Sequence, residues 1–197
     1  MRPLVSSLQR KSENYHMLIH ALLGVAAAYF ILSVFPEAPK TTLVIYGVLG
    51  GLLPDIDHFI YYFFYGKNSQ YAQIAKYFIL KKQLRNWAKF VKTNHKQNTG
   101  LYSHNFISLL LSVSLFVYFG LRKDHPGFAV FALSWSIHYL FDIFEDLLFF
   151  RRLNPNWYLK FNRNSPNFNL LNLELPFFSY PPENSGYKKP HREIRHN

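Results

Sequence analysis

The sequence predicts an all-α membrane protein, in which a bundle of about four transmembrane helices is joined to a basic amphipathic helix at the membrane interface. Four apolar blocks, each close to the length of a bilayer-spanning helix, recur along the 197 residues. The 22 Lys and Arg are gathered between alternate blocks. The chain has no cysteine, which excludes a disulfide scaffold, a thiolate metal site and a cysteine nucleophile.

The apolar blocks contain no Lys or Arg and cover residues 16–35, 41–65, 105–121 and 128–150. A helix needs about 20 apolar residues to cross the hydrocarbon core, so the third block is a little short. We interpret the first block as a retained helix, because no small-residue cleavage site follows it. In the second block Pro54 precedes an acidic sequence, and we expect the helix to break there and line a cavity.

The distribution of basic residues predicts the orientation of the bundle. Of the 22 Lys and Arg residues, three lie in residues 1–15, eight in residues 66–103 and eight in residues 151–197. These three segments are alternate loops of a four-helix path. By the positive-inside rule these loops face the cytoplasm. The sequence therefore predicts a multi-pass protein of the inner or plasma membrane with both termini cytoplasmic. Anionic lipid head groups are the partners that this charge indicates, and we expect no nucleic acid.

Two further segments complete the expected organisation, in which residues 1–150 form the bundle. In residues 69–93, apolar side chains recur at helical spacing with basic ones between them. This pattern is typical of an amphipathic helix on the inner leaflet, although a solvated helix that covers the bundle fits it also. Residues 151–197 are rich in Asn and Pro and predict a partly disordered cytoplasmic tail.

The polar residues of the blocks point to a metal. Five of the 11 carboxylates and five of the nine histidines lie inside the blocks or at their ends. An ionised carboxylate at the bilayer centre costs about 3 kcal/mol even on insertion scales, so each needs a cationic partner. The blocks offer no Lys or Arg, whereas His and carboxylate together are the ligand set of zinc, manganese or iron.

Spacing and depth support this interpretation. His16 and His20, like His138 and Asp142, are four residues apart and share a helix face. In the expected topology all four helices bring their polar residues to the cytoplasmic end. The predicted ligands are His20, Asp55, Asp57, His58, His104, His138 and Asp142. Because seven ligands exceed the roughly four that one zinc ion takes, the site is expected to hold one or two divalent ions.

Other polar residues have simpler interpretations. We interpret His16 as an interfacial histidine and Asp146 as a solvated residue at a helix end. Ser103 and Asn105 fit caps of the third helix. Asp57, if it is not a ligand, or Glu145 is the candidate general base.

Four motifs carry a resemblance to a known family: His20, Leu53-Pro54-Asp55-Ile56-Asp57-His58, Tyr102-Ser103-His104-Asn105 and His138-Tyr139-Leu140-Phe141-Asp142. Their order and spacing over about residues 16–146 resemble the YdjM-like inner-membrane metal-dependent hydrolases. The resemblance implies a multi-helix membrane protein that binds a divalent metal, with zinc favoured, and acts as a hydrolase. A fainter similarity connects the pattern to zinc-dependent phospholipase C.

The sequence departs from the family pattern at two places. The third motif of the family usually reads His-Arg-Gly-x-Thr-His-Ser, whereas residues 98–104 here lack the first His and the Arg. Glu145 stands where the family commonly has Thr, three residues after Asp142. The first change removes a ligand or a phosphate-contacting Arg, and the second adds a carboxylate.

Three functions fit these observations. The first is a metal-dependent hydrolase that cleaves a phosphoester of a lipid-like substrate at the cytoplasmic face. The second is a divalent-metal carrier or sensor that uses the same ligands without a reactive water. The third is a membrane anchor whose His and Asp side chains hydrogen-bond across the bundle.

Overall fold

The computed structural model describes residues 2–94 and 100–158, and the tail predicted over residues 151–197 lies mostly outside this part of the chain. Within it the secondary structure is helical, without a strand, which confirms the all-α class. The longer helices are α1 (Arg2–Val34), α2 (Lys40–Leu52), α3 (Ile56–Ile60), α4 (Gln70–Leu80), α5 (Leu84–Asn94), α6 (Phe106–Arg122) and α7 (Pro126–Glu145). Short helical turns are η1 (Leu53–Asp55), η2 (Tyr61–Tyr65), η4 (Asp146–Phe150) and η5 (Pro155–Trp157).

Three stretches are long and apolar enough to cross a membrane: Ser6–Val34, Lys40–Tyr65 and Pro126–Phe150. The fourth predicted span, α6, is apolar but has 17 residues. At about 1.5 Å per residue it is a few ångströms shorter than a hydrocarbon core of about 30 Å. The prediction of about four membrane helices therefore agrees with the structure, the fourth being a short one.

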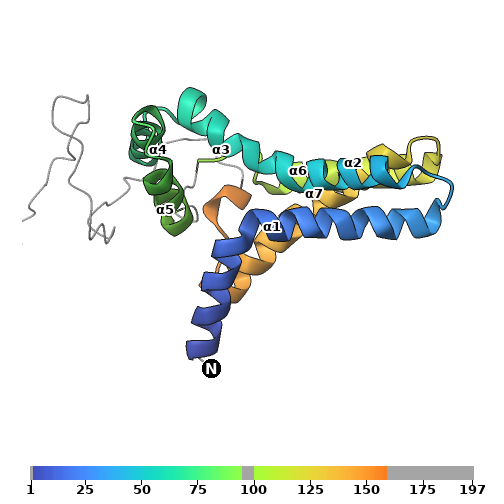
Figure 1. Ribbon diagram of the computed structural model, residues 1–197, viewed down its shortest axis with the longest axis horizontal. Helices are drawn as coiled ribbons and strands as arrows, with labels where there is room; N and C mark the ends of the chain where they lie inside the picture. Colours follow the sequence, from blue (N-terminus) through green and yellow to red (C-terminus); the bar gives the residue numbers. More distant parts are fainter. Residues whose placement is uncertain (1, 95–99, 159–197) are drawn as a thin grey trace, which may run out of the picture.

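The helices α1, α2 and α7 pack side by side, and α6 packs against α7 (Figure 1). Between α1 and α2 the approach is backbone to backbone. A Cβ atom built on Gly24 would lie 2.2 Å from the carbonyl oxygen of Gly47, and one on Gly47 would lie 2.2 Å from that of Gly24. Only glycine fits at this crossing, which is the way that small residues hold helices together in lipid.

The second membrane stretch breaks where the sequence predicts a break. Pro54 lies in η1, between α2 and α3, and has no backbone N–H to continue the helical ladder. A π-helical turn, η2, then ends the stretch. After this break Asp55 and His58 face the other polar side chains of the bundle, whereas Ile56, Phe59 and Ile60 are exposed on its flank.

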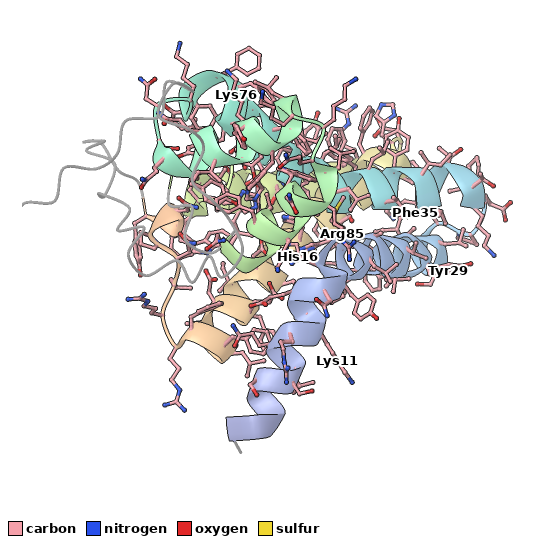
Figure 2. All side chains as sticks on the ribbon, turned by 60° about the vertical axis from the view of Figure 1, so that its left-hand side comes forward. Lys11, His16, Tyr29, Phe35, Lys76 and Arg85 are labelled. Carbon is pink, nitrogen blue, oxygen red and sulfur yellow. The ribbon has the colours of Figure 1, made fainter. Side chains whose placement is uncertain are left out.

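The first helix bends at Tyr15, whose backbone is not helical (φ −115°, ψ 15°). The bend separates an N-terminal arm, residues 2–15, from the part of α1 that packs in the bundle (Figure 1). Figure 2 shows Lys11 on this arm and His16 at the bend. We call the end of the bundle that contains this bend and α3 the polar end, and the end with residues 35–39 the far end.

The structure has two helices where the sequence predicts one amphipathic helix over residues 69–93. Lys82 adopts a left-handed conformation (φ 56°), which ends α4 and lets α5 fold back along it. The rings of Phe78 and Phe90 lie 6.1 Å apart across this hairpin. The apolar faces of the two helices thus cover each other and an aromatic cluster that includes Tyr62 and Tyr71. The hairpin lies at the polar end (Figure 1).

Candidate metal centre

Four separate elements bring His and Asp side chains to one place at the polar end. The side chains come from α1, from the segment after Pro54, from the loop before α6 and from α7. They form four overlapping groups of three whose possible ligand atoms lie within 4.8 Å of one another. The seven members of this metal-type cluster are His16, His20, Asp55, His58, His104, His138 and Asp142.

Asp142 lies at the centre of the cluster. Its Oδ2 atom is 3.4 Å from Nε2 of His104 and 3.5 Å from Nε2 of His138, and its Oδ1 atom is 3.6 Å from Nε2 of His20. These separations exceed those of an N–H···O hydrogen bond, about 2.7–3.2 Å. They match the spacing of about 3.4 Å between two ligands that each lie about 2.1 Å from one tetrahedral ion. The donor set and its spacing therefore fit a divalent metal.

Asp55 forms a second centre beside the first. Its Oδ1 atom is 3.7 Å from Nε2 of both His104 and His138, and 4.0 Å from Nε2 of His58. His104 and His138 thus face both carboxylates. The cluster is a continuous set of ligands around Asp55 and Asp142, with room for its members to be shared between two ions.

The tautomer of His138 is fixed by a hydrogen bond to the backbone. Its Nδ1 atom lies 2.8 Å from the carbonyl oxygen of Gly51, so Nδ1 carries the proton and donates it. The Nε2 atom then presents a lone pair to the two carboxylates and is buried without a hydrogen-bond partner. A lone pair that faces carboxylate oxygens is repulsive unless a cation lies between them. An imidazole oriented by a backbone carbonyl is typical of a metal ligand.

His104 lies just outside the membrane stretches, in the loop before α6. Burial lowers the pKa of its imidazole, but the nearby carboxylates of Asp142 and Asp55 outweigh burial and raise the pKa to about 9. The cluster thus attracts a positive charge at the place where these three side chains meet. Ser103 is on the other side of the ring, with Oγ 2.8 Å from Nδ1 of His104. Asn105 caps α6 by accepting from the Ser108 amide, as predicted.

His16 belongs to the cluster, whereas the sequence analysis interprets it as an interfacial histidine. Its Nε2 atom is 3.1 Å from Nε2 of His20 and 3.8 Å from Asp142 Oδ1. Its Nδ1 atom is 3.4 Å from Oε2 of Glu145, whose other oxygen accepts from the Ser12 hydroxyl. Glu145, the predicted general base, therefore contacts the cluster through His16.

Asp57, predicted as a ligand or a base, lies apart from the four groups. Its carboxylate accepts hydrogen bonds from the hydroxyl of Tyr65 (2.7 Å) and from the backbone amides of Tyr102 (3.0 Å) and Ser103 (2.8 Å). These contacts hold the loop that carries His104 against α3. The placement of Asp57 thus differs from the prediction, because its oxygens are used by the loop.

A layer beyond the ligands was not evident in the sequence. Asp146 is buried rather than solvated, and its Oδ2 atom accepts from the amide of Asn154 and from the indole of Trp157, each at 2.9 Å. The Asn156 side chain accepts from the amide of Leu101 at 3.3 Å. Residues 151–158 are thereby tied over the cluster. The sequence Asn-Pro-Asn-Trp, with its turn residues next to a large aromatic ring, is the signal that was available.

These residues enclose a small cavity beside the ligands. It has a volume of about 40 Å³, enough for a few water molecules, and its lining includes His16, Asp55, His58, His104 and Asp142. Asp146 and Trp157 also line it. The arrangement can hold a metal ion with water beside it.

The fold and the site together define a helical membrane protein with a buried cluster of His and Asp side chains. The chain belongs to the YdjM inner membrane protein family, whose model matches residues 16–173. This match confirms the resemblance and the inner membrane. A search of curated proteins and a search of solved structures each find no match.

Proposed function

We propose that this protein is a membrane-embedded, divalent-metal-dependent hydrolase that cleaves a phosphoester of a lipid-like substrate at the cytoplasmic face. One observation carries the metal: the buried Nε2 lone pair of His138 points at Asp55 and Asp142 with no donor between them. No Lys or Arg occurs in the four apolar blocks to neutralise these carboxylates.

Two of the ligand groups share no residue and suggest positions for two ions. One consists of His16, His20 and Asp142, and the other of Asp55, His58 and His104. His138 faces both carboxylates. Zinc is favoured through the family resemblance, and manganese and iron accept the same ligands.

A metal held by these residues would supply Lewis-acid charge for the phosphoryl oxygens and would lower the pKa of a water molecule bound to it. The chain's own residues supply the proton chemistry. Glu145 lies outside the ligand groups, with Oε2 3.4 Å from Nδ1 of His16, and its carboxylate is the proposed proton acceptor. Asp57 holds the loop of His104 instead, because its oxygens already accept three hydrogen bonds. Asn154, Asn156 and Trp157 complete the lining of the cavity in which this chemistry would take place.

The substrate class follows from the surroundings of the site. The N-terminal arm and the α4–α5 hairpin, whose sequences are basic, lie at the polar end (Figure 1), which the positive-inside rule assigns to the cytoplasm. An anionic head group is attracted to this end. Its acyl chains remain in the membrane beside the helices, so a phospholipid reaches the site without leaving the bilayer.

The test uses the purified full-length chain in nanodiscs of phosphatidylethanolamine and phosphatidylglycerol, loaded with zinc, manganese or iron. Incubated with head-group-labelled phospholipids, it should release a water-soluble product or diacylglycerol. The variant Asp142→Asn should abolish release, and Asp124→Asn, in the exposed loop before α7, should not. Absence of turnover for every lipid class with metal bound contradicts the hydrolase.

A divalent-metal carrier or sensor is the second candidate. The small volume of the cavity, about 40 Å³, favours it, because this space suits an ion with water better than a phosphoester. Metal uptake into liposomes that is abolished by His104→Ala or Asp142→Ala would support transport. Less than one metal ion per chain by elemental analysis, unchanged when Asp55 or His138 is replaced, contradicts both candidates and leaves the membrane anchor.

A further inference from the structure

We infer that an apolar groove on the flank of the bundle binds one acyl chain of the membrane lipid whose head group is the substrate. The inference rests on the proposed function and adds to it the site that selects the substrate. The groove has a volume of about 430 Å³, within the range of about 300–1,000 Å³ that small-molecule sites have. Its apolar lining consists of Leu53, Pro54, Ile56, Ile60, Phe131 and Trp135.

The position of the groove identifies its occupant as hydrocarbon. Every apolar lining residue belongs to one of two membrane stretches, Lys40–Tyr65 and Pro126–Phe150. Leu53, Ile56 and Ile60 are 40–47% exposed, so the groove is continuous with the surface that the family's membrane location turns toward lipid. Apolar side chains at this depth meet acyl chains before any other molecule.

The groove and the metal cavity lie on opposite sides of a wall that is one residue thick. Pro54 lines the groove and the next residue, Asp55, lines the cavity. Likewise Ser103 lines the groove and His104 lines the cavity. The Ser103 hydroxyl closes the wall, with Oγ 2.8 Å from Nδ1 of His104 and 3.4 Å from the carbonyl oxygen of Pro54. A chain in the groove is therefore held one residue away from the ligands.

The polar residues of the groove indicate where the head group of a bound lipid lies. Asp57, Tyr102 and Ser103 line the same groove, and Asp57 accepts hydrogen bonds from the amides of the other two. In the expected topology Ile60 lies closer to the cytoplasm than Asp57, so a lipid with its head group at the loop that carries His104 has its acyl chain along Leu53 and Phe131, toward the middle of the bilayer. The groove orients a lipid substrate toward the metal and gives the site a preference for long chains.

Photocrosslinking tests binding without any need for turnover. The full-length chain is placed in vesicles of phosphatidylethanolamine and phosphatidylglycerol, with a diazirine on one acyl chain of the latter. We expect labelling of residues 53–60 and 131–135 above that of Ile107 and Leu110 on α6, although these two residues are more exposed. The variant Ile56→Trp, which fills the groove, should remove this excess. The control Ile45→Trp makes the same change in the same stretch, at an exposed position outside the groove, and should keep it.

The second measurement is the dependence of KM on chain length, with phosphatidic acids of short and long acyl chains. In the wild-type protein we expect KM to fall about tenfold for each two methylene groups that the groove buries. In Ile56→Trp this dependence should flatten, whereas in Ile45→Trp, outside the groove, it should stay as in the wild type. Melting temperature and metal content of both Trp variants should equal those of the wild type.

The outcomes separate the groove from the hydrolase. Labelling that is even over all lipid-facing residues overturns the groove, and so does crosslinking of the groove to a second copy of the chain. If the protein hydrolyses lipids with a KM that does not change with acyl-chain length, the groove proposal is overturned and the proposed hydrolase function stands. Selective labelling without hydrolysis supports the groove as a lipid site and contradicts the hydrolase.

Discussion

The same helices behave differently at the two ends of the bundle. Toward the far end α1 and α2 touch through the backbones of Gly24 and Gly47, and the Ser134 hydroxyl of α7 donates to the Gly47 carbonyl at 2.6 Å. At the polar end they surround a cavity lined by His and Asp side chains. Apolar helices that meet by backbone contact cannot shift, so the far end fixes how the polar side chains face one another.

Gly51 connects the two ends. A Cβ atom there would lie 2.5 Å from the carbonyl oxygen of His20, so its backbone packs directly on α1. Its own carbonyl accepts from His138. One glycine thus sets the distance between α1 and α2 and the ring orientation of a ligand on α7. The geometry of the metal-type cluster therefore depends on the close backbone packing of α1 and α2 as well as on the cluster's own side chains.

The largest expected effect comes from the packed end. The variant Gly47→Val places a side chain 2.2 Å from the Gly24 carbonyl, and we expect a loss of more than about 3 kcal/mol from overpacking, with loss of the metal site. Thermal unfolding in detergent measures it. The control Gly120→Ala, on α6, has no atom within 4 Å of the new Cβ and should be neutral or stabilise by about 0.5–1 kcal/mol. A Gly47→Val protein as stable as the wild type contradicts the rigid role of this end.

The next effect is confined to the polar end. Replacing His138 by Ala removes the ligand that faces both carboxylates, so metal affinity should fall by more than about 100-fold, beyond the loss typical of outer residues. Elemental analysis and metal titration measure it. His125→Ala changes an exposed histidine before α7 and should leave metal content unchanged. Equal metal content in both variants would show that the cluster is not a metal site.

A smaller effect is expected one layer out. Glu145 contacts His16 through Nδ1, and Glu145→Gln removes the charge while it keeps the shape. Metal affinity should fall by about 10–100-fold, as for other carboxylates that orient a ligand histidine. Glu13→Gln, on the N-terminal arm, changes a carboxylate that accepts a hydrogen bond from Gln9 outside the cluster and should have no effect on metal titration. An unchanged affinity in Glu145→Gln would make Glu145 irrelevant to the metal.

The smallest effect concerns the segment over the cavity. Asp146→Ala removes the acceptor of the Trp157 indole and the Asn154 amide, at a local cost of about 1–3 kcal/mol. With Trp87 and Trp135 replaced by Phe, the emission of Trp157 should shift to longer wavelength as water enters, while metal content is kept. Asp146→Asn, which retains an acceptor oxygen, should shift it less. A shift of equal size in both variants would argue against the hydrogen bonds.

Much of the fold follows from local sequence patterns. The blocks at residues 16–35, 41–65 and 128–150 match the three membrane stretches, and the break at Pro54 lies where its missing N–H requires one. The break at Lys82 was not predictable, because a left-handed lysine has no distinct signal. The apolar period continues through it, since both helices of the hairpin turn their apolar faces to the same aromatic cluster.

At the site, the sequence predicts most of the side chains that meet in the cluster, but not the contacts that surround them. His138 and Asp142 share a helix face by spacing alone, and the structure brings them to the cluster. Asp57 and His16 could not be distinguished in this way. The contacts of Asp57 come from amides 45 and 46 residues away, and those of His16 depend on the bend at Tyr15 and on Glu145. Long-range contacts with backbone amides and bends within a helix cannot be predicted from the types of the residues involved.

The position of the cluster along the chain has a consequence for biogenesis. Three of the four ligand groups contain His138 or Asp142, and both lie on α7, the last membrane stretch of the described chain. A chain that has been inserted only as far as α6 holds a single group, formed by Asp55, His58 and His104. If the cluster binds a metal as proposed, its ligand set is complete only once α7 has joined the earlier helices.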